Sequence, residues 1–177
     1  MTGEQQRLID EAGAIGVALS AEQAVRALRL LDELSVWNRT YSLTAITTRE
    51  AMIHSHLLDS LSGYAELNGT RIADVGTGPG FPGLPLALVS PQREFMLIDS
   101  VAKKLRFVTH AVRVLELTNV TTQQVRVESL SPAQPYDTVL ARAFAALPDL
   151  LAAVQGLCGP ATRVIAFKGQ YPADELA

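Results

Sequence analysis

The sequence predicts an α/β fold with a doubly wound, mostly parallel sheet and a helical cap at its N-terminus. From residue 67 onward, short apolar runs alternate with helical patterns across short loops, which is typical of a parallel sheet with helices on both faces. Right-handed crossovers wind such a chain into a doubly wound sheet. Residues 1–66 show helical patterns only. We therefore expect one compact domain in two parts, a helical cap over 1–66 and an α/β core over 67–177.

Helical signals divide the N-terminal part into three segments, expected over 4–16, 20–36 and 49–66. Ser20 is placed to cap the second segment, and Gln23 occupies the position that completes a capping box. Apolar residues at helical spacing predict its buried face: Val25, Leu28, Leu31 and Leu34. We expect a polar and aromatic loop over 37–45.

The remaining elements follow from short apolar runs and from the helical patterns between them. We expect strands over 71–75, 95–99, 120–127, 138–141 and 163–167. We expect helices over 83–90, 102–117 and 146–157. Near the C-terminus, Pro172 is followed by Asp174 and Glu175, which is typical of the start of a helix. We therefore expect a further C-terminal segment, with the last strands of the sheet missing from this sequence.

Composition narrows the class of protein. Hydrophobic residues make up 48% and charged residues 19% of the 177 residues, as in globular proteins. The net charge of −3 means that any nucleic-acid site must gather its positive charge locally. Cys158 is the only cysteine, which excludes an internal disulfide and favours the cytoplasm. No signal peptide, membrane-spanning run or metal-ligand spacing is recognisable, so we expect neither membrane nor metal.

A glycine-rich turn follows the first expected strand and is the most informative stretch of the chain. It reads Asp74-Val-Gly76-Thr-Gly78-Pro-Gly80-Phe81-Pro-Gly83. The carboxyl end of a strand is where such sheets bind ligands, and glycines let the backbone approach them closely. The same letters fit a dinucleotide fingerprint or a plain structural turn. However, a carboxylate at Asp74 suits a cationic ligand better than a diphosphate, and prolines remove backbone donors. We therefore favour S-adenosylmethionine, with Asp74, Gly76, Gly78 and Gly80 beside it.

Two further carboxylates follow later strands. Asp99 ends the second strand, where this fold meets ribose hydroxyl groups, or it caps the next helix, a role that Ser100 could also fill. Glu128 follows the third strand, where a loop often meets the adenine edge, or it is a solvated loop residue. Both alternatives remain open for each residue.

Basic residues are candidates for contacts with RNA. Arg142 and Lys168 end the fourth and fifth strands at the ligand-binding edge, where an unneeded buried arginine would be unfavourable. The other candidates are Arg39, Lys103, Lys104 and Arg106, together with Tyr41 as a surface for base stacking. Each could equally be an ordinary surface residue. His56 and Asp59, three apart on a helix, could pair structurally or brace the loop before them.

Several short sequence motifs of this chain resemble those of the bacterial small-subunit rRNA guanine-N7 methyltransferases, the RsmG or GidB family. The resemblance covers nearly the whole chain and rests on Trp37-Asn38, Ser42–Ala45, His56–Ser60, Asp74–Gly83, Leu97–Ser100 with Lys103-Lys104, Arg126–Glu128, Ala141–Phe144 and Phe167–Gln170. It implies a Rossmann-like class I methyltransferase fold, with another helix and a final antiparallel strand pair beyond residue 177. It also implies methyl transfer from S-adenosylmethionine to N7 of a guanine in the 530-loop region of 16S rRNA. The cofactor contacts that it implies are Gly76, Phe81, Val127, Glu128 and Arg142, with Asp99 added by the fold.

The implied chemistry requires no general base, because guanine N7 carries a free lone pair. Catalysis should then come mainly from alignment of donor and acceptor. Candidates for positioning are Arg142, Asn38, His56 and Lys168. The partner would be 16S rRNA or the small ribosomal subunit, met by a cytoplasmic monomer. Two alternatives remain, an oxidoreductase that binds NAD and a non-catalytic RNA-binding assembly factor.

Overall fold

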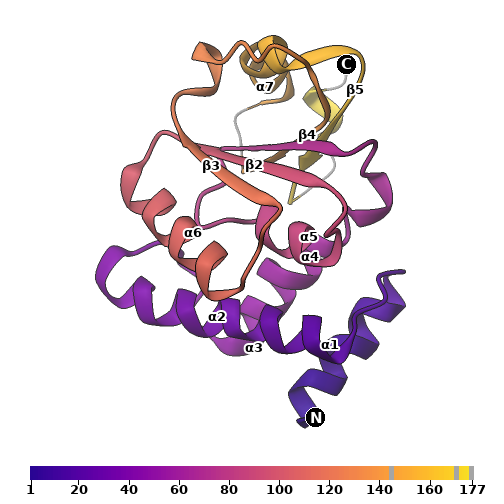
Figure 1. Cartoon of the computed structure of the whole chain (residues 1–177), viewed down its shortest axis with the longest axis vertical. Helices are drawn as coiled ribbons and strands as arrows, with labels where there is room; N and C mark the ends of the chain where they lie inside the picture. Colours follow the sequence, from indigo (N-terminus) through magenta and orange to yellow (C-terminus); the bar gives the residue numbers. More distant parts are fainter. Residues whose placement is uncertain (144–145, 170–171, 176–177) are drawn as a thin grey trace.

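A five-stranded parallel sheet forms the centre of the molecule, in the order β3-β2-β1-β4-β5 (Figure 1). The computed structural model describes residues 1–143, 146–169 and 172–175. The strands are β1 (Arg71–Val75), β2 (Glu94–Asp99), β3 (Val120–Gln124), β4 (Tyr136–Arg142) and β5 (Cys158–Phe167). The chain moves outward from β1 through β2 to β3 and then crosses to β4 on the other side of β1. This reversal places the topological switch point at the carboxyl ends of β1 and β4, where open sheets of this kind bind ligands.

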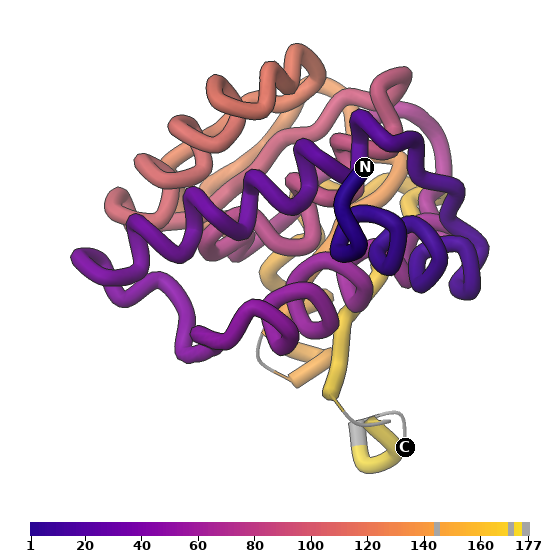
Figure 2. Tube along the Cα trace, turned by 90° about the horizontal axis from the view of Figure 1, so that it is seen from below, coloured from indigo at the N-terminus to yellow at the C-terminus, as the bar shows by residue number. Residues whose placement is uncertain are grey.

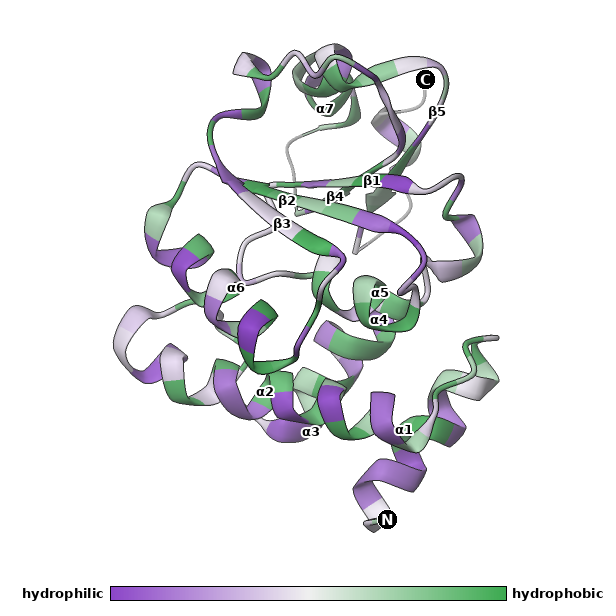
Figure 3. Cartoon of the chain, viewed as in Figure 1, coloured by the Kyte–Doolittle hydropathy of each residue, from purple (hydrophilic) through white to green (hydrophobic). Residues whose placement is uncertain are grey.

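Helices cover the two faces of the sheet unequally. One face carries α5 (Gly83–Val89) and α6 (Ala102–Val114), with the N-terminal helices packed below them (Figure 1). The other face carries α7 (Leu147–Val154) and the short η4 (Gln155–Leu157). Successive strand residues point to opposite faces of the sheet and pack into two separate hydrophobic cores. Ile72 belongs to the core shared with the N-terminal helices, and Ala73 belongs to the core beneath α7. Figure 3 shows that α5 is apolar on every visible side, as expected for a helix between the sheet and the N-terminal helices.

The N-terminal helices share the larger core with the sheet. They are α1 (Gly3–Ala14), α2 (Ala21–Tyr41), α3 (Arg49–Met52) and α4 (Asp59–Leu61). Leu8 and Leu30 are fully buried in the same cluster as Leu97 of β2. Seen from below in Figure 2, these helices lie across the face that α5 and α6 cover. No described helix is long and apolar enough to span a membrane.

The capping box predicted at Ser20 is confirmed. The Ser20 hydroxyl accepts from the Gln23 N–H at 3.1 Å, and the Gln23 side chain accepts from the Ser20 N–H at 2.9 Å. The expected buried face is right for Leu28, Leu31 and Leu34 but wrong for Val25, which is 46% exposed. Ala24 and Ala27 are buried instead, because α2 turns a slightly different stripe toward α5 and α6.

The loop expected over 37–45 is wrong at its beginning, because α2 continues to Tyr41. Trp37 packs against Phe107 and His110 of α6, with ring centroids 5.7 and 5.0 Å apart. These tertiary contacts stabilise a turn that local propensity does not favour. Ser42, whose φ of 48° is left-handed, caps the C-terminal end of the helix.

The single helix expected over 49–66 is interrupted. After α3 comes a π-helical segment, η1 (Ile53–Leu58), then α4, and finally the 3₁₀ turn η2 (Tyr64–Glu66). A π-helical turn rotates the residues after it relative to an α-helix, and such turns are frequent at functional sites. Here the segment carries His56, which is 7% exposed.

Other boundaries differ by a few residues. β3 ends at Gln124, before the 3₁₀ turn η3 (Val127–Ser129), while β4 and β5 are longer than expected. α6 and α7 end earlier, at Val114 and Val154. The helical start expected after Pro172 is the 3₁₀ turn η5 (Ala173–Glu175).

Candidate functional site

The glycine-rich turn leaves β1 at the switch point and has a backbone that only glycine adopts easily. Gly76, Gly78 and Gly80 have φ values of 65°, 60° and 93°. At Gly80 space is also limiting, because an added Cβ would lie 2.3 Å from Leu84 Cδ1. The turn can therefore pass close to a ligand on one side while packing on α5 on the other.

Asp74 holds this turn from below. Its carboxyl group is fully buried, and Oδ2 accepts from the Thr77 hydroxyl at 2.6 Å and from the Gly83 N–H at 2.9 Å. Burial is the main reason that its pKa rises to about 7. Its Oδ1 is buried and has no hydrogen-bond partner among the described residues. In this structure Asp74 lies beneath the turn, and sequence reasoning did not foresee that orientation.

Asp99 joins the turn to the next strand. Its Oδ2 accepts from the Gly78 N–H at 2.9 Å, and its Oδ1 accepts from the Val101 N–H at 2.8 Å, at the start of α6. Lys104 Nζ lies 4.0 Å from Oδ2. The carboxylate therefore supports the helix start, the role weighed against ligand binding, and it also forms part of a cleft wall.

A cleft of 140 Å³ opens beside the turn, between the carboxyl ends of the central strands and η3. Its lining includes four residues expected to hold the cofactor, Gly76, Asp99, Val127 and Glu128. The other lining residues are Ile98, Ser100, Val125 and Arg126, none of which was predicted from the sequence to contact the cofactor. Ile98 and Val125 could have been found, because Ile98 adjoins Asp99 and Val125 lies two residues before Val127.

The chemistry of this cleft fits a nucleoside. Two carboxylates can accept hydrogen bonds from ribose hydroxyl or base amino groups, and Ile98 with Val127 offers apolar walls for a flat ring. Asp99 is only 6% exposed, so it is held in place before any ligand arrives. The residues present thus fit the adenosine part of S-adenosylmethionine.

A second cleft, of 320 Å³, opens at the carboxyl ends of β4 and β5. It brings together three of the positioning candidates, Arg142, His56 and Lys168. Its other lining residues are Ile46, Ser55, Asp59, Ala143, Phe167 and Gly169. Val75 pairs with Ala141 across β1 and β4, so Gly76 of the first cleft and Arg142 of the second follow directly paired residues. The two clefts therefore flank the switch point.

Arg142 is anchored on three sides within the second cleft. Its Nη2 donates to the Ser55 carbonyl at 2.7 Å and to the Asp59 carboxylate, and its guanidinium lies 5.9 Å from the Phe167 ring centroid. Burial lowers the pKa of Arg142 from its ordinary value. His56 and Asp59 make no hydrogen bond or ion pair with each other in the described part of the chain. Arg142 is the partner of Asp59.

His56 connects the N-terminal part with the glycine-rich turn. Its ring stacks on Phe81 at 4.6 Å between centroids, and its Nε2 lies 3.1 Å from Thr44 Oγ1. Burial, assisted by the charge of Arg142, lowers its pKa to about 4, so the imidazole is neutral at physiological pH. Phe81 is 3% exposed, and its ring lies against His56 beneath the turn rather than in the first cleft.

Asn38 does not line the second cleft but stabilises the loop that contacts His56 in its wall. Its amide donates to the Thr44 carbonyl at 3.0 Å and accepts from the Thr44 N–H at 2.9 Å. This pair fixes the loop after α2, and Thr44 in turn contacts His56. Asn38 is thus a positioning residue for the loop.

The remaining basic candidates are distributed over the C-terminal end of α2 and the N-terminal half of α6. Lys103 Nζ donates to the Tyr41 carbonyl at 3.1 Å, which joins the two helices. Arg39 borders a separate hollow beside Thr47 and Met52, and Arg106 borders one between α6 and β3. The structure does not gather all of these charges into a single patch.

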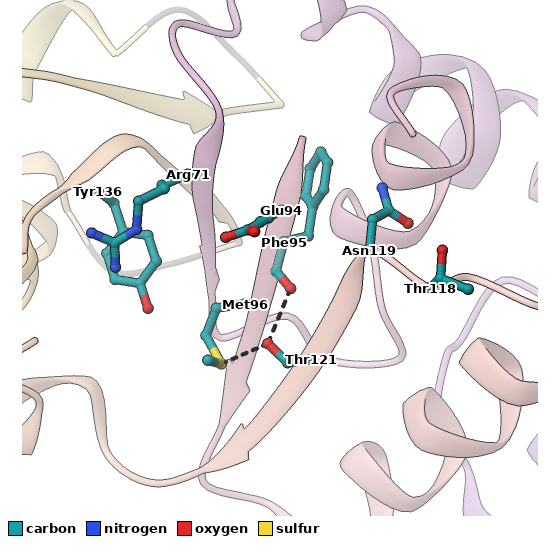
Figure 4. Close-up of a pocket in the computed structure, with 8 residues that line it drawn as sticks. All are labelled: Arg71, Glu94, Phe95, Met96, Thr118, Asn119, Thr121 and Tyr136. Carbon is teal, nitrogen blue, oxygen red and sulfur yellow. Dashed lines mark hydrogen bonds between the residues drawn. The ribbon is translucent and has the colours of Figure 1, made fainter. Parts of the chain in front are cut away.

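A further hollow, of 280 Å³, lies at the opposite edge of the sheet, near the amino ends of the strands (Figure 4). Arg71 lies over the Tyr136 ring at 5.1 Å, and the Thr121 hydroxyl donates to Met96 Sδ at 3.5 Å. It carries no glycine-rich turn and lies at the wrong edge for ligand binding in this fold. Among the described residues, no group of three or more His, Cys, Asp or Glu is placed to hold a metal ion.

Comparison with known proteins identifies the family. A model of the GidB family, described as rRNA small subunit methyltransferase G, matches residues 23–177. The chain belongs to this family. The ribosomal RNA small subunit methyltransferase G of Methylococcus capsulatus is 48% identical over 162 residues, which cover 92% of this chain and 79% of the relative. The Idiomarina loihiensis protein of the same name is 42% identical over 99% of this chain and 84% of its own length.

Solved structures confirm the Rossmann-like class I methyltransferase fold. Coclaurine N-methyltransferase bound to N-methylheliamine and SAH has a TM-score of 0.57 at 15% identity, over 92% of this chain and 58% of that one. The DhpI–SAH complex has a TM-score of 0.52 at 15% identity, over 84% and 70%. At these identities the similarity concerns the fold alone.

Proposed function

We propose that this member of the GidB family transfers a methyl group from S-adenosylmethionine to N7 of a guanine in 16S rRNA. The observation that carries the proposal is the pair of clefts that flank the switch point. One fits a nucleoside, and the other holds a partly buried arginine beside a neutral histidine. Membership in a family described as small-subunit rRNA methyltransferases supports the substrate class.

The first cleft is the proposed cofactor site. Bound there, S-adenosylmethionine would supply a methyl group on a positively charged sulfur, which makes that carbon electrophilic. Asp99 and Glu128 are placed to accept hydrogen bonds from hydroxyl or amino groups, and Val127 offers an apolar wall. Gly76, Gly78 and Gly80 give the close backbone approach.

Two of the proposed cofactor residues act indirectly. Asp74 holds the turn through Thr77 and Gly83. Phe81 fixes its outer part against His56. Arg142 lines the second cleft next to the switch point, from where it would face both ligands.

The second cleft is the proposed site of the target base. Guanine N7 attacks with a lone pair that is already free, so no residue has to remove a proton first. What the protein must supply is alignment and a favourable electrostatic environment. Arg142 and Lys168 line the cleft, and His56 and Asn38 hold its wall.

RNA would approach over the C-terminal end of α2 and the N-terminal half of α6, where the basic candidates are distributed. Arg39, Lys103, Lys104 and Arg106 are the proposed phosphate contacts, together with Lys168 at the mouth of the second cleft. Contacts of this kind position the nucleic acid without reading its sequence. We further propose that the N-terminal part, 1–66, acts as a cap on the α/β core of a cytoplasmic, monomeric enzyme.

Methyl transfer from labelled S-adenosylmethionine to deproteinised 16S rRNA and to intact small subunits tests the proposal. Mass mapping of the product should find one 7-methylguanosine. Methylation at another atom, or no methylation of either substrate, would contradict the proposal. Calorimetry should detect S-adenosylmethionine binding, whereas tight binding of NAD alone would favour an oxidoreductase. Binding of RNA without transfer would favour an assembly factor.

A further inference from the structure

Arg142 and Asp59 form an ion pair inside the second cleft, and both line it. Arg142 is held from behind by the Ser55 carbonyl and by Phe167. Asp59, at the start of α4, keeps half of its side chain exposed, with a relative accessibility of 52%. Part of its carboxylate is therefore accessible to a ligand while the arginine stays fixed.

We propose that Asp59 is the residue that selects guanine as the methylated base, together with Arg142. The inference rests on the proposed function and deepens it. A guanidinium beside a carboxylate presents a donor followed by two acceptors. Cytosine presents the same order to guanine in a base pair. Guanine O6 would accept from Arg142, while the N1–H and the N2 amino group would donate to Asp59.

The same arrangement rejects adenine. Adenine carries an amino donor where guanine has O6 and an acceptor where guanine has N1–H, so both positions would be mismatched. Sites built to hydrogen-bond a polar group discriminate strongly against an analogue that lacks it, because the groups that the bound base covers are then left unpaired. Guanine N7 lies outside the Watson–Crick edge and would remain uncovered.

Asp59 would also assist the reaction itself. Methylation at N7 makes the base cationic, and the positive charge is shared with the N1–H side of the ring. A carboxylate that already accepts from N1–H stabilises that charge more in the transition state than in the ground state. Asp59 is therefore expected to affect kcat as well as KM.

The test compares the wild type with Asp59→Asn, Asp59→Ala and a control, Glu66→Gln. Glu66 forms a similar half-exposed ion pair, with Arg163 at 3.3 Å, outside the second cleft. The substrate is 16S rRNA assembled by splinted ligation, with guanosine or inosine at the nucleotide that the wild type methylates. Inosine lacks only the N2 amino group.

The wild type and Glu66→Gln should prefer guanosine to inosine by about 10-fold or more in kcat/KM, as loss of a charge-assisted hydrogen bond predicts. Asp59→Ala should lose about 10- to 100-fold activity on guanosine and methylate both RNAs equally. Asp59→Asn should keep KM closer to the wild type and lose mainly kcat, because it keeps an acceptor without the charge. Calorimetry should show unchanged S-adenosylmethionine affinity in all variants.

An equal rate on guanosine and inosine by the wild type overturns the inference whether or not any variant folds. An unchanged guanosine preference in Asp59→Ala overturns it as well. Both outcomes leave guanine-N7 transfer by the wild type intact. Failure of the proposed function is a different result, the absence of 7-methylguanosine from the wild-type reaction.

Discussion

The rings of His56 and Phe81 stack, 4.6 Å apart at an interplanar angle of 20°. One belongs to the π-helical segment of the N-terminal part and the other to the glycine-rich turn. This contact joins the wall of the second cleft to the turn that borders the first. A substitution of either ring should therefore alter the geometry of both clefts.

His56 should make the protein less stable in acid. Its pKa is about 4 in the folded protein and 6.5 in the unfolded chain, so between these values the unfolded chain binds more protons. The free energy of unfolding should be fully present above pH 6.5 and fall as the pH drops toward 4, by up to about 3 kcal/mol. Urea unfolding across this range should show a smaller pH slope for His56→Gln. The exposed His54→Gln serves as the control, and an identical slope in His56→Gln would contradict the assignment.

Asp74 should give the free energy of unfolding the opposite pH dependence. Its folded pKa of about 7 lies above the unfolded value of 3.8, so stability should fall as the pH rises through that interval. Asp74→Asn keeps an oxygen for Thr77 and Gly83 and should lose this pH slope. Asp74→Ala loses both hydrogen bonds and should be less stable by about 2–4 kcal/mol. If the charge of Asp74 instead met the cofactor directly, Asn would weaken S-adenosylmethionine binding at pH 8 without changing the slope.

The two glycines of the turn should respond differently to alanine. At Gly80 an added Cβ would strike Leu84 at 2.3 Å, and φ is 93°. At Gly78 the nearest atom would be the Gly76 carbonyl oxygen at 3.9 Å, so only the positive φ opposes the change. Thermal unfolding should show a loss of about 1 kcal/mol for Gly78→Ala and a larger loss for Gly80→Ala. Equal losses would mean that α5 shifts to make room.

Lys103 should contribute to RNA affinity through charge alone. Lys103→Ala should weaken binding of all RNA sequences alike and reduce the slope of log Kd against log salt by about 1. Arg113→Ala is the matched control, because Arg113 is exposed near the far end of the same helix. Filter binding at several salt concentrations measures both slopes. An unchanged slope for Lys103→Ala would remove this residue from the RNA surface.

Local patterns were sufficient to predict the sheet and the strand ends beside which the two candidate clefts open. The turn after β1 and the strand ends at Asp99 and Arg142 follow from apolar runs and glycines, which act over a few residues. The extension of α2 to Tyr41 could not be predicted in this way, because it depends on Trp37 meeting Phe107 and His110 of a distant helix.

The orientation of side chains was harder to predict than the position of their backbone. Asp74 and Phe81 were expected to meet the cofactor, yet their side chains lie beneath the turn. Whether a strand-end carboxylate turns up or down depends on partners such as Thr77 and Gly83, which become close only in the folded turn. The pairing of Asp59 with Arg142 likewise joins residues from separate parts of the chain.

Cys158, the only cysteine of the chain, begins β5 at the edge of the sheet opposite both clefts. A thiol-reactive fluorophore would therefore attach at one defined point, distant from the proposed chemistry. Burial raises the pKa of this thiol, so mildly alkaline conditions should be needed for labelling. Energy transfer from that dye to an acceptor on the RNA would then report how the substrate lies across the protein.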